Sequence, residues 1–174
     1  MTDKQTIESL NQLSQNTFIA QLDNIFEHSS WVAEQTYPKR PFNTVAELHK
    51  TMFDIVLESS IDDRLRLIRN HPELAGKETE QGTLTTYSKK EQSTAGLDQC
   101  TADELEQLHS LNKRYLHRFG FPFVIAVSGL NKHQIIAAMQ ERLLNDHDTE
   151  FAACIREIGK IGRIRLDALF DETS

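Results

Sequence analysis

Several residue types that define whole classes of protein are scarce in this sequence. Its 174 residues include only two Cys, four Pro, seven Gly and one Trp. The two cysteines, Cys100 and Cys154, match no metal-binding spacing, and we expect them to be free thiols rather than part of a disulfide framework. The low content of proline and glycine excludes a disordered or turn-rich chain. The remaining possibility is an ordinary globular protein with a hydrophobic core.

Positive charge is also scarce, with 19 Lys and Arg against 26 Asp and Glu and a net charge of −7. This balance argues against nucleic acid or an anionic membrane as partner, because either needs a basic face, although an isolated basic pocket stays open. No apolar run approaches the ~20 residues needed to cross a bilayer. The N-terminus lacks the apolar segment of a signal peptide, and the C-terminus lacks a Ser-Lys-Leu peroxisomal signal. We therefore expect a cytoplasmic protein.

Helical periodicity is abundant. Apolar residues recur at intervals of three and four after four potential N-cap residues, namely Ser14, Thr44, Ser60 and Thr101. In the helix that follows Ser60, we expect Ile61, Leu65 and Ile68 to face the core. The pattern predicts an all-α fold, and the lack of repeats or linkers predicts a single domain over residues 1–174.

Two segments do not fit the helical pattern. Residues 73–87 are polar, with two glycines and several threonines, and we expect them to form a surface loop. Residues 121–127, "FPFVIAV", form the one continuous apolar run bounded by turn signals. Because no second run is available to pair with it, we expect buried extended chain rather than a strand.

A helix is expected to end at His71-Pro72. A residue before proline is restricted to extended conformations, so the imidazole of His71 leaves the helix in a direction set by covalent geometry. Rigid placement suits a general acid or base. The alternative is that His71 merely caps the last carbonyl groups of the helix.

A second candidate group lies in "SKKEQ", which we expect near the start of a short helix ending at Gly96. Ser88 and Glu91 have the spacing of a capping box, an ordinary structural role. Alternatively, Ser88, Glu91 and Gln92 could bind a polar, amide-rich ligand at a helix start, where free amides and the dipole add to the site. The two interpretations compete for the carboxylate of Glu91.

Arginine near the C-terminus provides a third candidate. Arg163 and Arg165 should face different ways on a helix, so one can point inward, where it would need an anion such as a substrate carboxylate. The alternative is two solvated arginines. The histidines show no metal-ligand spacing, and nucleotide or phosphate loops are missing, so we expect neither a metal nor an organic cofactor.

Five blocks in order, "EHSSWVAE", "NHPELAGK", "SKKEQSTAGL", "FGFPFVIAV" and "RIRLDALF", resemble the 2-oxo-4-hydroxy-4-carboxy-5-ureidoimidazoline (OHCU) decarboxylase family over residues 9–170. The resemblance implies an all-α carboxy-lyase, a homodimer without cofactor, that converts OHCU to (S)-allantoin after uricase and hydroxyisourate hydrolase. One departure is Ser30, where the family commonly has proline.

The same resemblance implies roles for individual residues. The catalytic residues would be His71, Glu91 and Arg165, with Arg163 facing solvent. The substrate-binding residues would be Pro72, Ser88, Lys89, Lys90, Gln92, Phe123, Val124, Ile125, Ala126 and Val127. His71 would protonate one face of the planar intermediate left by CO2. Two other functions stay open at this point: a ureide hydrolase with Glu91 as base, and a non-catalytic helical interaction module.

Overall fold

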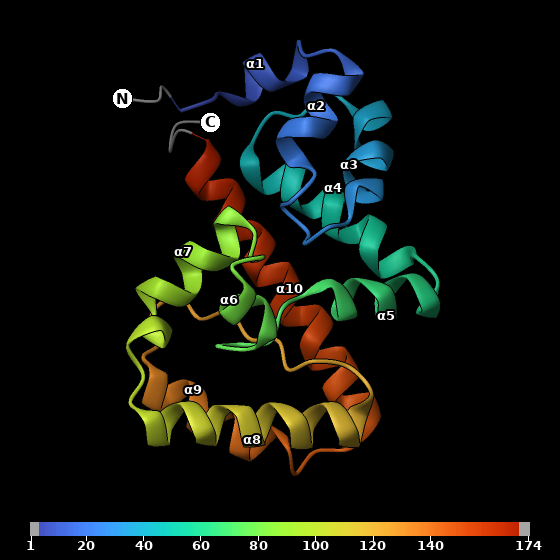
Figure 1. Ribbon diagram of the computed structural model, residues 1–174. Helices are drawn as coiled ribbons and strands as arrows, with labels where there is room; N and C mark the ends of the chain where they lie inside the picture. The colour runs from blue at the N-terminus through green and yellow to red at the C-terminus, as the bar shows by residue number, and fades with distance from the viewer. Residues whose placement is uncertain (1–3, 171–174) are drawn as a thin grey trace. The chain divides into compact units, whose positions relative to one another are not determined.

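The computed structural model describes residues 4–170, and helices account for all of the regular secondary structure in that range (Figure 1). The one extended pairing found there is an isolated bridge between Gln5 and Phe170. The predicted all-α fold is therefore confirmed. The α-helices are α1 Ile7–Asn11, α2 Gln15–Leu22, α3 Ser30–Thr36, α4 Val45–Glu58, α5 Ile61–Asn70, α6 Lys77–Gln81, α7 Thr86–Thr94, α8 Ala102–Phe119, α9 Lys132–Arg142 and α10 His147–Leu169. Two short 3-10 helices span Tyr37–Lys39 and Leu97–Gln99.

The chain divides into two compact units, the first formed by residues 1–67 with 159–174 and the second by residues 68–158. Helices α5 and α10 pass from one unit to the other along the sequence. Each unit is described by itself below. The extent of a single domain over residues 1–174 stays a prediction.

In the first unit, α3 packs against both α2 and α4 (Figure 1). Ser14 accepts a hydrogen bond from the amide of Thr17 and starts α2, and Thr44 does the same for Glu47 at the start of α4. Both predicted caps are confirmed. The apolar side chains facing the core are Phe18, Leu22, Ile25, Phe26, Leu48, Met52 and Val56, all at most 1% exposed. Each such side chain contributes about 1.5–3 kcal/mol by leaving water.

In the second unit, α8 and α9 lie side by side (Figure 1). The predicted capping box of Thr101 and Glu104 opens α8, and Gly120 ends it with a φ of 80°, which glycine adopts without steric cost. Tyr115 and Phe119 at the end of α8 contact Phe121 after the turn. The segment after α8 is thereby buried beside its own helix.

Two expectations were wrong. Residues 73–87 are not one loop, because they contain α6 and the first two residues of α7. Glu78 and Glu80 in the first turn of α6 favour a helix start, and Gly82 closes it in the left-handed region. Ile61 does not face the core, since it is 66% exposed. The end of α5 buries Leu67 and Ile68 instead, so only the last turn of that helix supplies core residues.

Candidate functional site

His71 lies where α5 ends, as predicted. Its backbone amide donates to the carbonyl oxygen of Ile68 at 3.1 Å, closing the last turn, and Pro72 prevents a further one. His71 is only 7% exposed, so its imidazole is inside the protein rather than in bulk water. Glu73, two residues after His71, is a second titratable group: burial, together with the nearby carboxylate of Glu78, raises its pKa.

The backbone that follows His71 is held by α7. The Oε1 atom of Gln92 accepts hydrogen bonds from the amide of Ala75 at 2.9 Å and from the hydroxyl of Thr79 at 3.3 Å. Ala75 has a φ of 50°, an uncommon conformation for a non-glycine residue that its surroundings must stabilise. Gln92 is 5% exposed and was predicted as a substrate-binding residue. Its oxygen holds the turn after His71, which leaves its amide nitrogen as the end that suits a ligand.

Helix α8 holds the same turn from another direction. The Nδ2 atom of Asn112 donates to the carbonyl oxygen of Leu74 at 2.9 Å, and the Nε2 atom of His109 donates to that of Ala75 at 2.9 Å. His109 also lies 3.5 Å from a carboxylate oxygen of Glu80. Neither contact was expected, because a backbone carbonyl as partner leaves no residue pattern in the sequence. The turn that follows His71 is therefore fixed by two helices, α7 and α8.

The predicted capping box of Ser88 and Glu91 is wrong. Thr85 is the N-cap of α7, and its side chain accepts a hydrogen bond from the amide of Ser88 at 3.2 Å. Ser88 is therefore the third residue of the helix, and Glu91 lies one turn further on. The capping role for the carboxylate of Glu91 is thereby removed, and its role in a site stays a prediction.

Helix α7 buries one face only. Ser88 and Gln92, four residues apart, are 3% and 5% exposed and lie on the same face. Lys89 and Lys90 are exposed, and Glu91 is partly exposed. The buried face of α7 thus presents two uncharged polar side chains, as the predicted binding role of these two residues requires.

Residues 122–127 have no regular secondary structure, as expected for "FPFVIAV". Phe123, Val124 and Val127 are buried, and Ile125 and Ala126 are partly exposed. The extended chain is held by side chains instead of a partner strand, since Arg142 donates to the carbonyl oxygen of Val124 at 2.7 Å. Arg142 was missed by the sequence analysis.

Arg165 points inward and Arg163 outward, as predicted. Arg165 is 2% exposed, whereas Arg163 forms a surface ion pair with Asp167. The anion beside Arg165 belongs to the protein: its NH1 group donates to Glu27 at 2.7 Å and to the carbonyl oxygen of Asn24 at 2.9 Å. Glu27 was also missed. Arg165 belongs to the first unit, and the other predicted site residues belong to the second.

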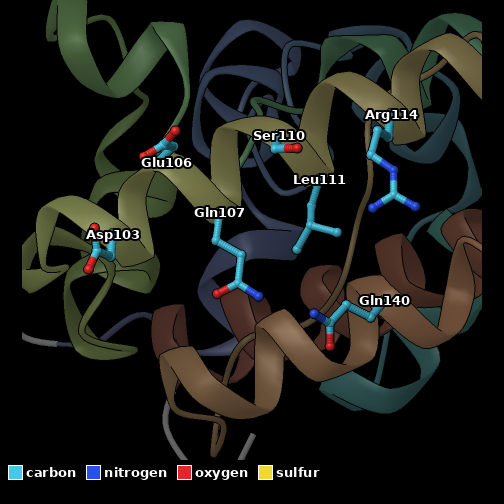
Figure 2. A pocket seen from close by; sticks show the side chains of 7 residues that line it. All are labelled: Asp103, Glu106, Gln107, Ser110, Leu111, Arg114 and Gln140. Carbon is cyan, nitrogen blue, oxygen red and sulfur yellow. The ribbon is translucent and has the colours of Figure 1, made fainter.

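A polar hollow of about 310 Å³ lies between α8 and α9, on a different set of residues (Figure 2). It is lined by Asp103, Glu106, Gln107, Ser110, Leu111, Arg114 and Gln140, none of which was predicted for the site. Over residues 4–170, no group of three or more His, Cys, Asp or Glu side chains is arranged to hold a metal ion. Within the same range, no helix is long and apolar enough to span a membrane.

The fold and the site together define an all-helical protein with a buried histidine at a helix end and a polar helix face that holds the turn after this histidine. Comparison with known proteins identifies the family. The model of the OHCU decarboxylase family matches residues 11–167, and the chain belongs to that family.

Named relatives cover the chain almost completely. The OHCU decarboxylase of Haloferax volcanii is 39% identical over 95% of this chain and 96% of its own length. The uric acid degradation bifunctional protein of Bacillus sp. strain TB-90 is 42% identical over 95% of this chain but only 32% of its own length. The chain thus spans about a third of the bifunctional relatives.

Solved structures give the same result. A crystal structure of (S)-allantoin synthase superposes with a TM-score of 0.78 at 29% identity, covering 96% of this chain and 55% of that chain. A crystal structure of OHCU decarboxylase in the presence of (S)-allantoin gives a TM-score of 0.68 at 28% identity, covering 85% of this chain and 96% of that chain.

Proposed function

We propose that this chain decarboxylates OHCU to (S)-allantoin, the step after uricase and hydroxyisourate hydrolase in urate degradation. The observation that carries the proposal is the family match over residues 11–167, with His71 buried at the expected helix end. The Haloferax volcanii relative bears the name of this enzyme, and one similar structure was solved with (S)-allantoin present. From the same family resemblance we infer a homodimer in the cytoplasm.

The chemistry needs little from the protein besides positioning and a proton. The carboxylate of OHCU is attached to the carbon next to a ring C=N bond. When the C–C bond to CO2 breaks, its electron pair forms a C=C bond to the carbon of that C=N group, and the C=N π pair moves onto the nitrogen. The substrate therefore supplies its own electron sink. The intermediate is planar at the former C=N carbon, which bears the ureido group, and a proton delivered to one face of this carbon gives one enantiomer of allantoin.

His71 is assigned as the proton donor. It must be held rigidly, and the turn after it is fixed by Gln92 from α7 and by Asn112 from α8. Glu91 is assigned a place beside the imidazolium of His71, because a neighbouring carboxylate favours the charged form of the imidazole. Arg165 is assigned to an anionic or carbonyl oxygen of the substrate.

The remaining residues are assigned to substrate binding. Ser88 and the amide nitrogen of Gln92 would hold the ureido arm, because both lie on the buried face of α7. Pro72, Lys89 and Lys90 would line the same pocket. Residues 123–127 would contact the substrate partly through backbone groups.

The test follows OHCU, generated freshly from urate, by circular dichroism and by CO2 release. Replacing His71 by Asn should lower the rate by about 10²–10⁴-fold, the usual effect of losing a positioned proton donor, and should give racemic allantoin from the spontaneous reaction. His117→Asn is the matched control, because His117 is an exposed histidine in α8. Full turnover to pure (S)-allantoin by His71→Asn would refute the assignment. Release of ammonia or urea instead of CO2 would indicate a ureide hydrolase.

A further inference from the structure

A fully buried carboxylate, which is not among the residues assigned above, lies in the second unit. Glu150 in α10 is 0% exposed, and its oxygens accept three hydrogen bonds. The donors are the hydroxyl of Tyr115 at 2.6 Å, the Nε atom of Arg142 at 2.8 Å and the Nδ2 atom of Asn145 at 3.0 Å. A buried charge is tolerated when it is paired and hydrogen-bonded in this way. Glu150 therefore fixes the position of Arg142, whose side chain is 14% exposed.

The guanidinium of Arg142 faces the segment predicted to bind substrate. Its NH1 group donates to the carbonyl oxygen of Val124 at 2.7 Å, and its central carbon lies over the ring of Phe123, 4.4 Å from the ring centroid. Its NH2 group is 3.4 Å from the sulfur of Cys154. A planar guanidinium offers five donors in a fixed geometry and a flat face that can lie over an aromatic ring, whereas an ammonium group has only three donors and no flat face. Arg142 thus joins the extended segment to the buried carboxylate.

Residues 123–127 need the hydrogen bond from Arg142 because they have no secondary structure of their own. Among residues 4–170, no backbone hydrogen bond between main-chain groups involves Ile125 or Ala126, the two residues after Val124. Both are partly exposed. Backbone amides and carbonyls require partners, so these groups suit a polar ligand rich in amides. Their position depends on the residue before them, whose carbonyl Arg142 holds.

We propose that Arg142 and Glu150 are positioning residues that hold residues 123–127 in the geometry that binds substrate. The inference rests on the proposed function and adds two residues to it. Neither residue is assigned to contact the substrate: Glu150 acts on Arg142, and Arg142 acts on Val124. The competing explanation is a buried ion pair that stabilises the unit and has no influence on binding.

The experiment compares Arg142→Met with Arg118→Met. Arg118 is a matched control in the same unit: it donates to the backbone oxygen of Asn145 at 2.9 Å and lies over the ring of Phe119. In the described part of the chain, none of its hydrogen bonds, ion pairs or ring contacts reaches residues 123–127. Amide hydrogen exchange of residues 124–127 and steady-state kinetics on OHCU are measured for both variants. Exchange reports the local order of the segment even without turnover.

The expected result is faster exchange of residues 124–127 in Arg142→Met, together with a KM for OHCU raised about tenfold or more and a nearly unchanged kcat. Losing a group that binds the substrate and the transition state equally well raises KM and leaves kcat unchanged. Arg142→Lys should be intermediate, because it keeps the charge but cannot make all the contacts. Glu150→Gln should also be intermediate, since its amide oxygen still accepts hydrogen bonds. Both conservative variants serve the same comparison if Arg142→Met does not fold.

Several outcomes would overturn the inference. If Arg142→Met folds and keeps the KM and the amide exchange rates of the wild type, residues 123–127 do not need Arg142 to hold their geometry. Equal changes in the Arg142 and Arg118 variants would show a general loss of stability. The proposed function is separable by His71→Asn: if that variant loses activity while the Arg142 variants keep their KM, only the positioning inference is wrong. A wild-type chain that releases no CO2 from OHCU would overturn both.

Discussion

The buried pair of Arg165 and Glu27 allows a quantitative prediction in the first unit. Both side chains are 1% exposed, and the donor and acceptor atoms are 2.7 Å apart. Replacing Glu27 by Leu removes the carboxylate and leaves the guanidinium charge in a dry environment. Replacing Arg165 by Met removes the cation and leaves the carboxylate there. Each single variant should lower the free energy of unfolding by about 3–5 kcal/mol, the usual effect of breaking a buried ion pair.

The double variant should behave differently from the sum of the single ones. With Leu and Met in place of Glu27 and Arg165, no charge stays buried, and apolar side chains of similar volume fill the space. Such replacements are often neutral, so we expect the double variant to lie within about 1–2 kcal/mol of the wild type. A neighbouring surface pair is the control: Arg163 and Asp167 in α10 are 42% and 53% exposed, and Asp167→Asn should cost only about 0.3–0.5 kcal/mol.

The assay is urea unfolding at neutral pH, monitored by the fluorescence of Trp31 in α3, which belongs to the same unit. Activity on OHCU is measured in parallel, since Arg165 is assigned to the substrate. If Glu27→Leu lowered the free energy of unfolding by less than about 1 kcal/mol, the reasoning would be contradicted, because removing the partner of a buried charge should cost more than this. A double variant as unstable as the sum of the single ones would show that the two charges are not coupled.

Two further predictions concern packing and pH. A Cβ atom on Gly159 would lie 2.7 Å from the ring of Phe53. Gly159→Ala should therefore lower the free energy of unfolding by about 1–3 kcal/mol, although alanine has the better helix propensity. Phe53→Leu should relieve most of this loss, because it removes the ring. Stability in urea checks this, and an equally large loss in the Phe53→Leu background would contradict it. The pKa of Glu104 is lowered from 4.5 to about 2, chiefly by its hydrogen bond from Lys132. The stabilisation by this carboxylate is therefore present above pH 4.5 and lost as the pH falls towards 2. The difference in the free energy of unfolding between wild type and Glu104→Gln should disappear over that range. A difference that does not change with pH would disprove this account.

Local sequence was sufficient for several helix boundaries. Ser14, Thr44 and Thr101 start helices as predicted, because a hydroxyl that accepts an amide hydrogen bond within three residues acts through neighbours in the chain. The helix end before His71-Pro72 was equally predictable, since proline acts on the residue before it. The start of α7 was predicted wrongly, because Thr85 and Ser88 both have cap chemistry and the sequence does not show which one acts.

The sequence by itself thus determined the all-helical fold and several of its caps, while the inward direction of Arg165 came from the family resemblance and not from the helix pattern. Only the tertiary structure decided which distant residues the side chains on these helices contact. Glu27 beside Arg165, Asn112 on the turn after His71, and Arg142 on Val124 join residues far apart in the chain. Two of these three contacts end on a backbone carbonyl, which every residue carries. No residue type marks such a partner, so the contact becomes visible only when the folded chain brings donor and acceptor together.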